Sequence, residues 1–294
     1  EHYFFKLSKF SGKLKSWLKK APLQPEIKNS VKGWLEKGLE DWCISRDGPY
    51  YGFKIPGETD KYFYVWLDAP IGYISATKNL TKNWESYWKK GKVIHVIGKD
   101  IIYFHFLFWP AMLDGAGFKK PDDIIVHGFL TVNGKKMSKS RGTFFTAEDF
   151  LKLYSPEALR FFYAQHLSKK LADIDLDFEN FKETINNKLV ANLANFCYRT
   201  LSFSAQRYKG DVIKVKEEKL EKEVDKLIEK VKQNYQNFNY KDAISNILRI
   251  SDIGNVYFQK AEPWKDTENK QAEVSFCINL VRNLSILIKP VLPE

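Results

Sequence analysis

The sequence predicts an α/β domain followed by an all-α domain, and two patterns carry this prediction. In the first part, short apolar runs rich in β-branched and aromatic residues alternate with helical patterns, which is typical of a parallel sheet. From about Asp177 onward, apolar residues recur at helical spacing almost without pause, which is typical of a helix bundle. With 294 residues, of which 44% are hydrophobic, the chain is long enough for two cores.

The α/β part begins with a helical pattern and continues into apolar runs. Residues 3–42 place apolar side chains at helical spacing on both sides of a turn at Ala21–Pro25, which predicts two amphipathic helices. The apolar stretch IIYFHFLFWPAML is predicted to be helical, and both Asp100 before it and His127 fall near the carboxyl end of a strand, where parallel sheets bind ligands. The predicted strands are KYFYVWLDAP from Lys61, KVIHVIG at 92–98 and DIIVHGF at 123–129.

Local signals mark a hairpin and a helix start in the second part. Asn133-Gly134 is typical of a two-residue hairpin turn. Ser155-Pro156-Glu157 predicts a helix with Ser155 as its N-cap and proline in its first turn. The lysine-rich stretch 214–232 is predicted to be a solvated helix face rather than a binding patch.

The net charge, the cysteines and the lengths of the apolar stretches restrict the classes of protein to which the chain can belong. The formal charge of +11 makes the chain a candidate for binding a polyanion, although solubility alone explains such a charge equally well. The cysteines Cys43, Cys197 and Cys277 lie far apart with no CxxC pair, which argues against a disulfide framework and a zinc site and suits a reducing cytosol. No signal-peptide pattern opens the sequence, and the longest apolar stretch is too short to span a bilayer, so a cytoplasmic protein is expected.

The stretch VNGKKMSKSRGTFF at 132–145 is the most specific motif. It gathers lysines, an arginine and serines directly after the predicted hairpin turn. A solvated surface loop explains such a composition, and so does a loop that awaits an anionic ligand. Within it, residues 136–140 read KMSKS, which is the second signature motif of class I aminoacyl-tRNA synthetases.

Two further characteristic stretches precede this motif in the chain. They are YVWLDAPIGY at 64–73 and IGKDIIYFHFLFWPAML at 97–113. With VHGFLTVNGKKMSKSRGTF at 126–144, the chain resembles the methionyl-tRNA synthetase family of class I enzymes from Glu1 to Glu294. The resemblance implies the second half of the family's Rossmann-like parallel sheet (1–125), a KMSKS loop and stem-contact region (126–168) and a helix-bundle anticodon-binding domain (169–294).

The reaction that the resemblance implies has two steps. The methionine carboxylate attacks the α-phosphate of ATP, supplied with Mg²⁺, and the methionyl-adenylate then acylates the 3′-terminal ribose of tRNA(Met). Lys136 and Lys139 are expected to bind ATP and to meet the charge that accumulates on the departing pyrophosphate, which favours the transition state. Ser138 and Ser140 let the loop close tightly and complete the predicted catalytic set.

The resemblance also implies the substrate sites. A thioether favours aromatic edges, and the expected methionine-binding residues are Asp100, Trp66, Tyr73, Phe104, His105 and Trp109. Without the resemblance, each of these aromatic residues taken singly is more simply explained as an ordinary core residue. Asp100 would be a helix N-cap, and His105 would be a core histidine with satisfied hydrogen bonds. His127, Gly128 and, more weakly, Arg46 resemble positions on the nucleotide side. Asn195, Arg199 and Trp264 resemble the anticodon reader, the alternative being a surface polar pair and a packed tryptophan.

The first class I signature, His-x-Gly-His, is absent from the sequence, and so is the zinc-bearing knuckle that the family carries before this region. We therefore expect a complementary chain or segment with the HIGH motif and the zinc knuckle, and little adenylation by this chain alone. An open parallel sheet edge would also need such a partner. The competing hypotheses are a non-catalytic tRNA-binding module and, less favoured by the bundle, a different class I nucleotidyltransferase.

Overall fold

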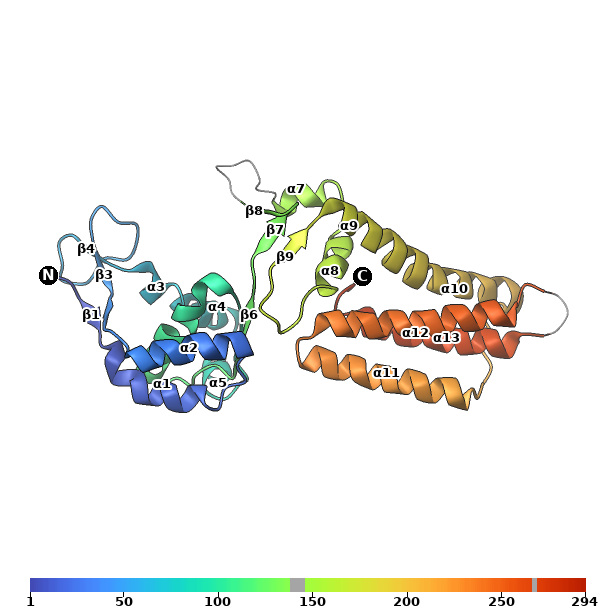
Figure 1. Cartoon of the computed structure of the whole chain (residues 1–294), viewed down its shortest axis with the longest axis horizontal. Coiled ribbons are helices and arrows are strands. Elements are labelled where there is room, and N and C mark those ends of the chain that lie inside the picture. Colours follow the sequence, from blue (N-terminus) through green and yellow to red (C-terminus); the bar gives the residue numbers. More distant parts are fainter. Residues whose placement is uncertain (138–145, 266–268) are drawn as a thin grey trace. The chain divides into compact units, whose positions relative to one another are not determined.

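The computed structural model describes residues 1–137, 146–265 and 269–294, which form two compact units (Figure 1). Unit 1 comprises residues 1–128 with 170–172, and unit 2 comprises 129–169 with 173–294. Ser138, Lys139 and Ser140 lie outside the described residues. The expected three-part division, with a stem-contact region at 126–168, stays a prediction.

Unit 1 opens with the predicted pair of amphipathic helices. A 3-10 turn, η1 (Leu7–Phe10), leads into α1 (Ser11–Leu18), and α2 (Pro25–Lys37) follows the expected turn with Pro25 in its first turn, where the missing N–H costs no hydrogen bond. The buried side chains recur at helical spacing: Leu14 and Leu18 in α1, and Ile27, Val31 and Leu35 in α2. These side chains form one core with the parallel strands described below.

Short antiparallel strands come next, and here one prediction is wrong. β1 (Phe4–Phe5) pairs with β2 (Trp42–Cys43), and β3 (Ser45–Asp47) pairs with β4 (Lys61–Phe63). The run from Lys61 was expected to be one buried strand, but after Phe63 it turns into α3 (Val65–Asp68), where Leu67 N and Ala69 N donate to the carbonyls of Tyr64 and Val65. An apolar run of this length does not distinguish a strand from a helical turn. α4 (Ile71–Leu80) and α5 (Trp84–Lys89) complete this region.

A parallel strand pair lies at the centre of unit 1, as predicted. β5 (Ile94–Gly98) pairs with β6 (Asp123–His127), so that Gly98 lies opposite His127 at their carboxyl ends. The crossover is helical up to Gly115: it contains the 3-10 turn η2 (Lys99–Ile101), the π-helical η3 (Phe104–Phe108) and α6 (Trp109–Gly115), and residues 116–122 lead irregularly into β6. On the other edge of β6, the buried Gln24 amide donates to Val126 O (2.9 Å) and accepts from Val126 N (2.8 Å), as a neighbouring strand would.

Unit 2 starts with a small sheet of order β8-β7-β9. β7 (Leu130–Val132) turns into β8 (Lys135–Lys136) through Asn133 and Gly134, whose φ angles of 46° and 72° are those of the predicted hairpin turn. β9 (Ile174–Leu176) runs parallel to β7. Ser155 caps α8 (Pro156–Ala164) as predicted, since its hydroxyl accepts from Ala158 N, and Thr146 caps α7 (Ala147–Leu151) in the same way.

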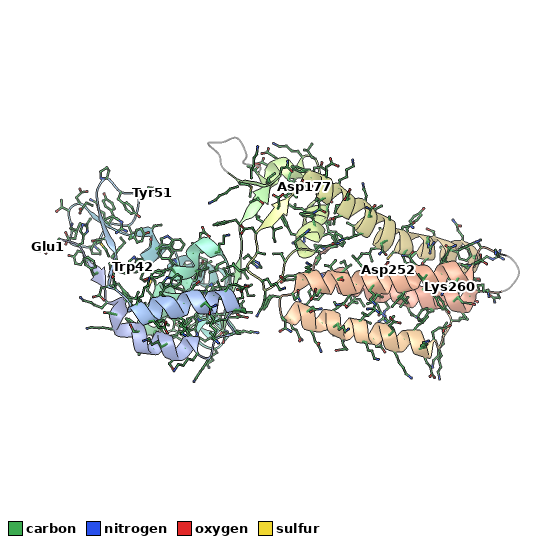
Figure 2. All side chains as sticks on the ribbon, in the orientation of Figure 1. Glu1, Trp42, Tyr51, Asp177, Asp252 and Lys260 are labelled. Atoms are coloured by element: carbon green, nitrogen blue, oxygen red, sulfur yellow. The ribbon has the colours of Figure 1, made fainter. Side chains whose placement is uncertain are left out.

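The rest of unit 2 is the predicted helix bundle. Asp177 (labelled in Figure 2) caps the first helix, and the elements in order are α9 (Phe178–Glu183), the π-helical η5 (Thr184–Ala194), α10 (Asn195–Tyr208), α11 (Glu218–Gln236), α12 (Tyr240–Ala261) and α13 (Gln271–Ile288). Figure 1 shows α11, α12 and α13 packed side by side. In α11 only Val224, Leu227 and Val231 are buried, so its lysine-rich remainder is the expected solvated face. Among the helices of the described part, none has both the length and the hydropathy to cross a bilayer.

Candidate active site

The predicted methionine-site aromatics come together in unit 1. The rings of Trp66 (α3) and Phe104 (η3) stack at a centroid distance of 4.1 Å and an angle of 9°. The Tyr73 hydroxyl on α4 lies 3.0 Å from Nε2 of His105, and the Tyr73 ring lies 6.1 Å from that of Trp109. Trp109 and His105 are buried, whereas 40% of Tyr73 is exposed, so the cluster has a buried back and an open front. We call these five residues the aromatic pocket.

His105 is held by the local helix geometry as well as by Tyr73. Its Nδ1 lies 3.1 Å from the carbonyl oxygen of Ile101, four residues earlier. This carbonyl sits just before the π-helical η3, and a side chain that bonds to a helix carbonyl is one of the local causes of such irregular turns. Burial lowers the pKa of His105, although the bond to Ile101 opposes this effect. Both ring nitrogens are thus partnered, which fits a satisfied core histidine as well as a pocket residue, and the role of His105 toward methionine stays a prediction.

The sequence interpretation missed two residues behind the pocket. His95 on β5 accepts a hydrogen bond from Nε1 of Trp109 at 3.1 Å, and both side chains are buried. Trp88 packs edge-on against Trp109 with centroids 6.1 Å apart, and its own Nε1 donates to Thr77. His95 belongs to the strand KVIHVIG, where the alternation of buried residues could have placed it facing inward.

Trp42 is a third missed residue, on the opposite side of the cluster. Its indole stacks on Phe108 at 3.9 Å and approaches Tyr64 edge-on at 5.8 Å and Phe104 at 6.2 Å. Trp42, labelled in Figure 2, lies on the short strand β2, and its ring contacts are with Phe104 and Phe108 of η3 and with Tyr64. Its sequence context gave no periodic signal, because β2 contains only two residues.

Asp100 lies beyond the carboxyl end of β5, as predicted, in the 3-10 turn η2. The alternative role as a helix N-cap is wrong, because Gly98 occupies the cap position and Asp100 lies inside the turn. A Cβ atom on Gly98 would lie 2.7 Å from Oδ1 of Asp100, so the absence of a side chain at Gly98 lets the carboxylate fold back over the strand end. Asp100 is exposed, and its role toward a substrate ammonium group stays a prediction.

The residues of unit 1 that are expected to lie near the nucleotide differ in their positions and contacts. His127 is the last residue of β6, directly opposite Gly98, and burial lowers its pKa. Gly128 follows it at the end of the first segment of unit 1. Arg46 is the weaker candidate: its Nη1 donates to the carbonyls of Ser45 (2.8 Å) and Cys43 (3.3 Å), while its guanidinium lies 3.8 Å above the ring of Tyr64.

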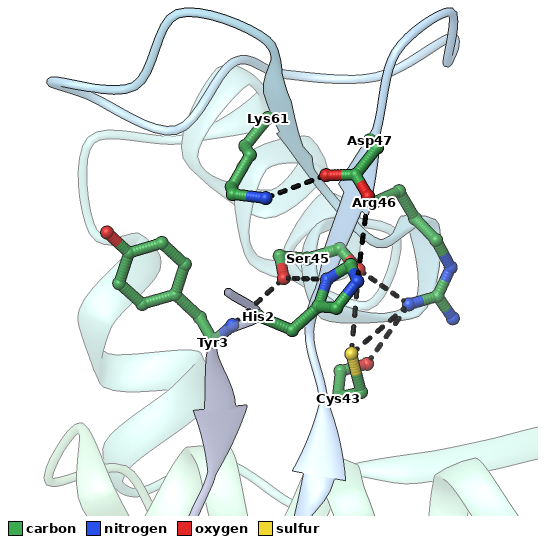
Figure 3. Close-up of polar contacts among 7 residues, drawn as sticks. All are labelled: His2, Tyr3, Cys43, Ser45, Arg46, Asp47 and Lys61. Carbon is green, nitrogen blue, oxygen red and sulfur yellow. Dashed lines mark hydrogen bonds and ion pairs between the residues drawn. The ribbon is translucent and has the colours of Figure 1, made fainter.

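Figure 3 shows the polar cluster around Arg46, which includes a serine–histidine–aspartate arrangement. Nδ1 of His2 lies 2.9 Å from Oγ of Ser45, and its Nε2 lies 3.6 Å from a carboxylate oxygen of Asp47. Ser45 is fully buried, and its Oγ also accepts from the backbone N–H of Tyr3. A nucleophile without access to solvent has no substrate, so this cluster ties β1 to β3 and carries no hydrolytic chemistry.

Of the KMSKS residues, the structure describes Lys136 and Met137. Lys136 ends the hairpin in β8, is exposed, and places its ammonium 4.5 Å from the ring centroid of Phe129. Both residues belong to unit 2, whereas the aromatic pocket belongs to unit 1. The roles of Lys139, Ser138 and Ser140 stay predictions.

Of the candidate anticodon residues, Arg199 and Trp264 both contact a residue of the bundle that the sequence interpretation missed. Phe258 on α12 lies beneath the guanidinium of Arg199 (4.8 Å) and beside the ring of Trp264 (6.2 Å). Nη2 of Arg199 donates to the carbonyl of Asn255, while its buried Nε has no hydrogen-bond partner within the described residues. Asn195 is exposed one turn earlier on α10, and Trp264 is 46% exposed. We call Asn195, Arg199, Phe258 and Trp264 the bundle cluster.

Among residues 1–137, 146–265 and 269–294, no three histidine, cysteine or acidic side chains are grouped as ligands of a metal ion. The cysteines are unpaired with one another: Cys277 is buried, and Cys43 and Cys197 are half-buried. Burial raises the pKa of the Cys277 thiol to about 12. Burial raises the pKa of Cys197 as well, so neither Cys197 nor Cys277 is poised as a thiolate.

Comparison with known families identifies the class of protein to which this chain belongs. Residues 1–201 match the family model for tRNA synthetases class I (M), and residues 209–294 match that for the anticodon binding domain of methionyl tRNA ligase. Since the first match covers more than half of the chain, the chain belongs to the class I tRNA synthetases, and within them to the (M) family. The predicted fold class, a parallel α/β part followed by a helical anticodon-binding domain, is confirmed.

Solved structures agree with this assignment. The methionyl-tRNA synthetase of Mycobacterium tuberculosis in complex with methionyl-adenylate is similar with a TM-score of 0.89 and 29% identity, covering 100% of this chain and 61% of that chain. The apo form of that enzyme gives a TM-score of 0.84 and 28% identity, covering 100% of this chain and 60% of that chain. The present chain thus spans about 61% of the length of these relatives.

Proposed function

We propose that this chain is part of a methionine–tRNA ligase, which uses ATP to form methionyl-adenylate and transfers methionine to the 3′ end of tRNA(Met). The observation that carries the proposal is the aromatic pocket, which is built around a crossover from the carboxyl end of β5 in a chain of the class I (M) family. The M. tuberculosis enzyme, similar over the whole of this chain, binds methionyl-adenylate.

The pocket suits a thioether side chain. Sulfur is polarizable and gains from contact with ring edges and faces, which Trp66, Tyr73, Phe104 and Trp109 offer from separate elements. Asp100, exposed beside the end of β5, is the proposed partner of the substrate ammonium group. Because every amino acid carries the ammonium group, the proposed selection of methionine rests on the thioether side chain.

The proposed chemistry needs little proton transfer in its first step. A carboxylate is already a nucleophile, so the protein has to align it with the α-phosphate and to stabilise charge on the leaving pyrophosphate. Lys136, Lys139, Ser138 and Ser140 are the proposed contributors to the second task, and His127 and Gly128 are proposed to lie against the nucleotide. The described residues gather no metal ligands, so Mg²⁺ would be held mainly by the phosphates of ATP.

A complementary chain or segment is proposed to supply the HIGH motif and the zinc knuckle. Within the described residues, β5 and β6 pair only with each other. Gln24 already occupies the outer edge of β6, whereas the other edge of β5 carries no strand, and Val96 in β5 is 62% exposed. Parallel sheets are normally buried on both faces, so β5 is the proposed edge for a further strand.

The bundle supports recognition of the anticodon. Trp264 offers an exposed ring for base stacking, while the exposed Asn195 and the half-buried Arg199 offer polar groups toward base edges. This same observation supports the second candidate function, a tRNA-binding module without catalysis. A cytoplasmic location is proposed because protein synthesis and free thiols both suit it.

The discriminating experiment is methionine-dependent ATP–pyrophosphate exchange, measured with the chain alone and after mixing with a polypeptide that carries the HIGH half. We expect little exchange alone and robust exchange after mixing. Lys139→Ala should lower the exchange rate at least a hundred-fold with methionine affinity nearly unchanged, because its charge acts on the leaving group. Lys152→Ala, an exposed lysine paired with Asp149, is the matched control and should leave the rate unchanged.

Two results would each contradict one part of this proposal. Ordinary turnover by the chain alone would remove the need for a partner. Absence of exchange in the mixture, with tRNA binding intact, would favour the module that binds tRNA without catalysis.

A further inference from the structure

A groove in unit 1 lies between α1 and α2, the two blue helices of Figure 1. Its volume is about 370 Å³, which is within the range of ligand-binding sites, and its lining comes from these two helices and the turn that joins them. None of the lining residues belongs to the aromatic pocket or to the bundle cluster. An occupant of the groove would therefore be distinct from the substrates of the proposed ligase.

The floor of the groove is apolar and belongs to the core of unit 1. Val31 and Leu35 are four residues apart, so they lie on one face of α2, and both are members of the core that α1 and α2 share. Leu18 at the end of α1 belongs to the same core, and Leu23 in the turn is half-buried against it. An apolar side chain that enters the groove thus meets a hydrophobic surface that is already packed.

Two pairs of exposed lysines line the groove beside this floor. Lys15 in α1 and Lys19 directly after it are four residues apart and so share one side of the helix. Lys28 and Lys32 are related in the same way on α2. The acidic residue of the lining is Glu36, which pairs with Lys32 at 3.6 Å. Within the described part of the chain, Lys15, Lys19 and Lys28 form no ion pair, so their three positive charges are uncompensated.

The helices themselves explain only one of these lysine pairs. Lys15 and Lys19 lie near the C-terminus of α1, where the helix dipole favours a positive charge. Lys28 is the fourth residue of α2, near the N-terminus, where the dipole favours acidic residues instead. Like charges four residues apart also repel, as Lys28 and Lys32 do. The positive charge on the α2 side of the groove therefore brings α2 no stability of its own.

A second hollow beside α1 differs from the groove in its ion pairs. It has a volume of about 740 Å³ and is lined by four lysines. Lys13 and Lys120 both pair with Asp114, and Lys119 pairs with Asp122. Three of the four lysines of this hollow are thus neutralised within the fold, whereas three of the four lysines of the groove remain available to a partner.

We propose that the groove between α1 and α2 binds an acidic amphipathic helix of a partner protein. Such a helix lays apolar residues at i, i+3 or i+4, and i+7 onto an apolar floor. Acidic residues on both sides of its apolar stripe face the two lysine pairs, which orients the helix and speeds its association. The lysine stems extend the apolar floor at its edges. A nucleic acid would use the charges alone and leave the floor uncovered, so a peptide fits the groove better.

A designed peptide tests the need for both charge and an apolar stripe. The probe is a short labelled helix with leucines at i, i+3 and i+7 and glutamates on both sides of them, and a peptide of the same composition in shuffled order is its control. Binding to the full chain is measured by fluorescence anisotropy. We expect saturable binding of the amphipathic peptide and at least about ten-fold weaker binding of the shuffled one, which cannot bury its leucines together. Equal binding of the two peptides, or binding of neither, would overturn the proposal.

A matched pair of charge-reversal variants locates the binding site. Lys15→Glu/Lys28→Glu reverses one charge on each side of the groove, whereas Lys20→Glu/Lys37→Glu reverses two exposed lysines outside it. Both variants change the net charge equally, so a general attraction to a basic protein affects them equally. We expect the affinity for the amphipathic peptide to fall at least about ten-fold in the first variant and less than about two-fold in the second. Equal losses would place the peptide elsewhere.

A milder variant keeps this test valid if charge reversal disturbs α1 or α2. Lys15→Gln/Lys28→Gln removes the two charges without adding acidic groups, and far-UV circular dichroism shows whether each variant keeps its helices. The loss of peptide affinity should be smaller than for the reversal and in the same direction. An unchanged affinity in this variant would exclude the lysines of the groove as the binding partners.

A short RNA duplex without an anticodon loop tests the other kind of polyanion. Its binding is measured with the same two reversal variants and in competition with the amphipathic peptide. We expect both variants to weaken the duplex equally, because a duplex responds to the positive charge of the whole surface. A loss confined to Lys15→Glu/Lys28→Glu, with no binding of the peptide, would assign the groove to nucleic acid and overturn the proposal. None of these measurements requires methionine activation, so they are decided independently of the proposed ligase function.

Discussion

The aromatic pocket of unit 1 and the bundle cluster of unit 2 use similar residues in opposite ways. In the pocket, Trp109 and its partner His95 are buried, and both ring nitrogens of His105 lie within hydrogen-bond distance of Tyr73 and Ile101. In the bundle cluster, Trp264 is 46% exposed, and Nε of Arg199 lacks a hydrogen-bond partner in the described part of the chain. A site for a small molecule needs fixed shape and proton positions, whereas a site for bases needs exposed faces and free donors.

Tryptophan fluorescence can follow the unfolding of unit 1 separately from that of unit 2. Seven of the eight tryptophans precede residue 129 and so belong to unit 1, and only Trp264 belongs to unit 2. Tryptophan emission in a Trp264→Phe background therefore follows unit 1 alone. Far-UV circular dichroism follows mainly the long helices of unit 2.

The largest expected effect is the loss of stability in Trp109→Ala. Trp109 is 2% exposed and packs against Trp88 and Leu113, so its truncation should lower the free energy of unfolding of unit 1 by about 3–5 kcal/mol. Denaturant unfolding followed by tryptophan emission measures this change. The helical signal of unit 2 should keep its midpoint. A loss below about 1 kcal/mol would mean that the pocket is not a rigid core element.

The next effect is an acid-dependent loss of stability. Burial, helped by the neighbouring His105, lowers the pKa of His95 from 6.5 to about 4. The unfolded chain then binds a proton before the folded chain does. The stabilisation is thus fully present above pH 6.5 and is lost as pH falls toward 4, a change of about 3 kcal/mol. Unfolding of unit 1 at a series of pH values measures it.

His95→Gln is the control for this acid effect, because its amide does not titrate. The variant should flatten the pH dependence between pH 6.5 and 4, leaving only the smaller contributions of His105 and His127, whose pKa values are lowered in the same direction. The carboxylates of unit 1 with lowered pKa values, such as Asp114, lose their contribution only at more acid pH. An unchanged slope in the variant would exclude His95 as the titrating group.

The smallest effect on stability is expected at Trp264. Its exposed position predicts that Trp264→Ala changes the free energy of unfolding by less than about 0.5 kcal/mol. Binding of an anticodon stem-loop should nevertheless weaken by about 1–3 kcal/mol, the usual value of one stacked base. Fluorescence anisotropy of the labelled RNA measures this loss. Tyr198→Ala, an exposed aromatic outside the bundle cluster, is the matched control. Equal effects of the two variants would exclude specific stacking at Trp264.

The sequence predicted a turn or a helix start correctly where the residues of one short stretch are sufficient to specify it. Asn133-Gly134 specifies its hairpin turn because few other residues adopt two consecutive positive φ angles, and Ser155-Pro156 specifies a helix start because it supplies both a cap and a fixed φ. The run after Lys61 misled the prediction, because an apolar pattern of that length fits a strand and a helical turn equally well.

The sequence by itself thus determined the α/β-then-α order, the cap at Ser155, the turn at Asn133-Gly134, and the aromatic residue types that define the pocket. Only the tertiary structure joined Trp109 on α6 to His95 on β5, and Phe258 on α12 to Arg199 on α10, because each pair unites residues from different elements. The same holds for Gln24, whose amide completes the edge of β6 from 102 residues away. Side-chain hydrogen bonds between distant segments leave no periodic trace in a sequence, since they depend on how the elements pack.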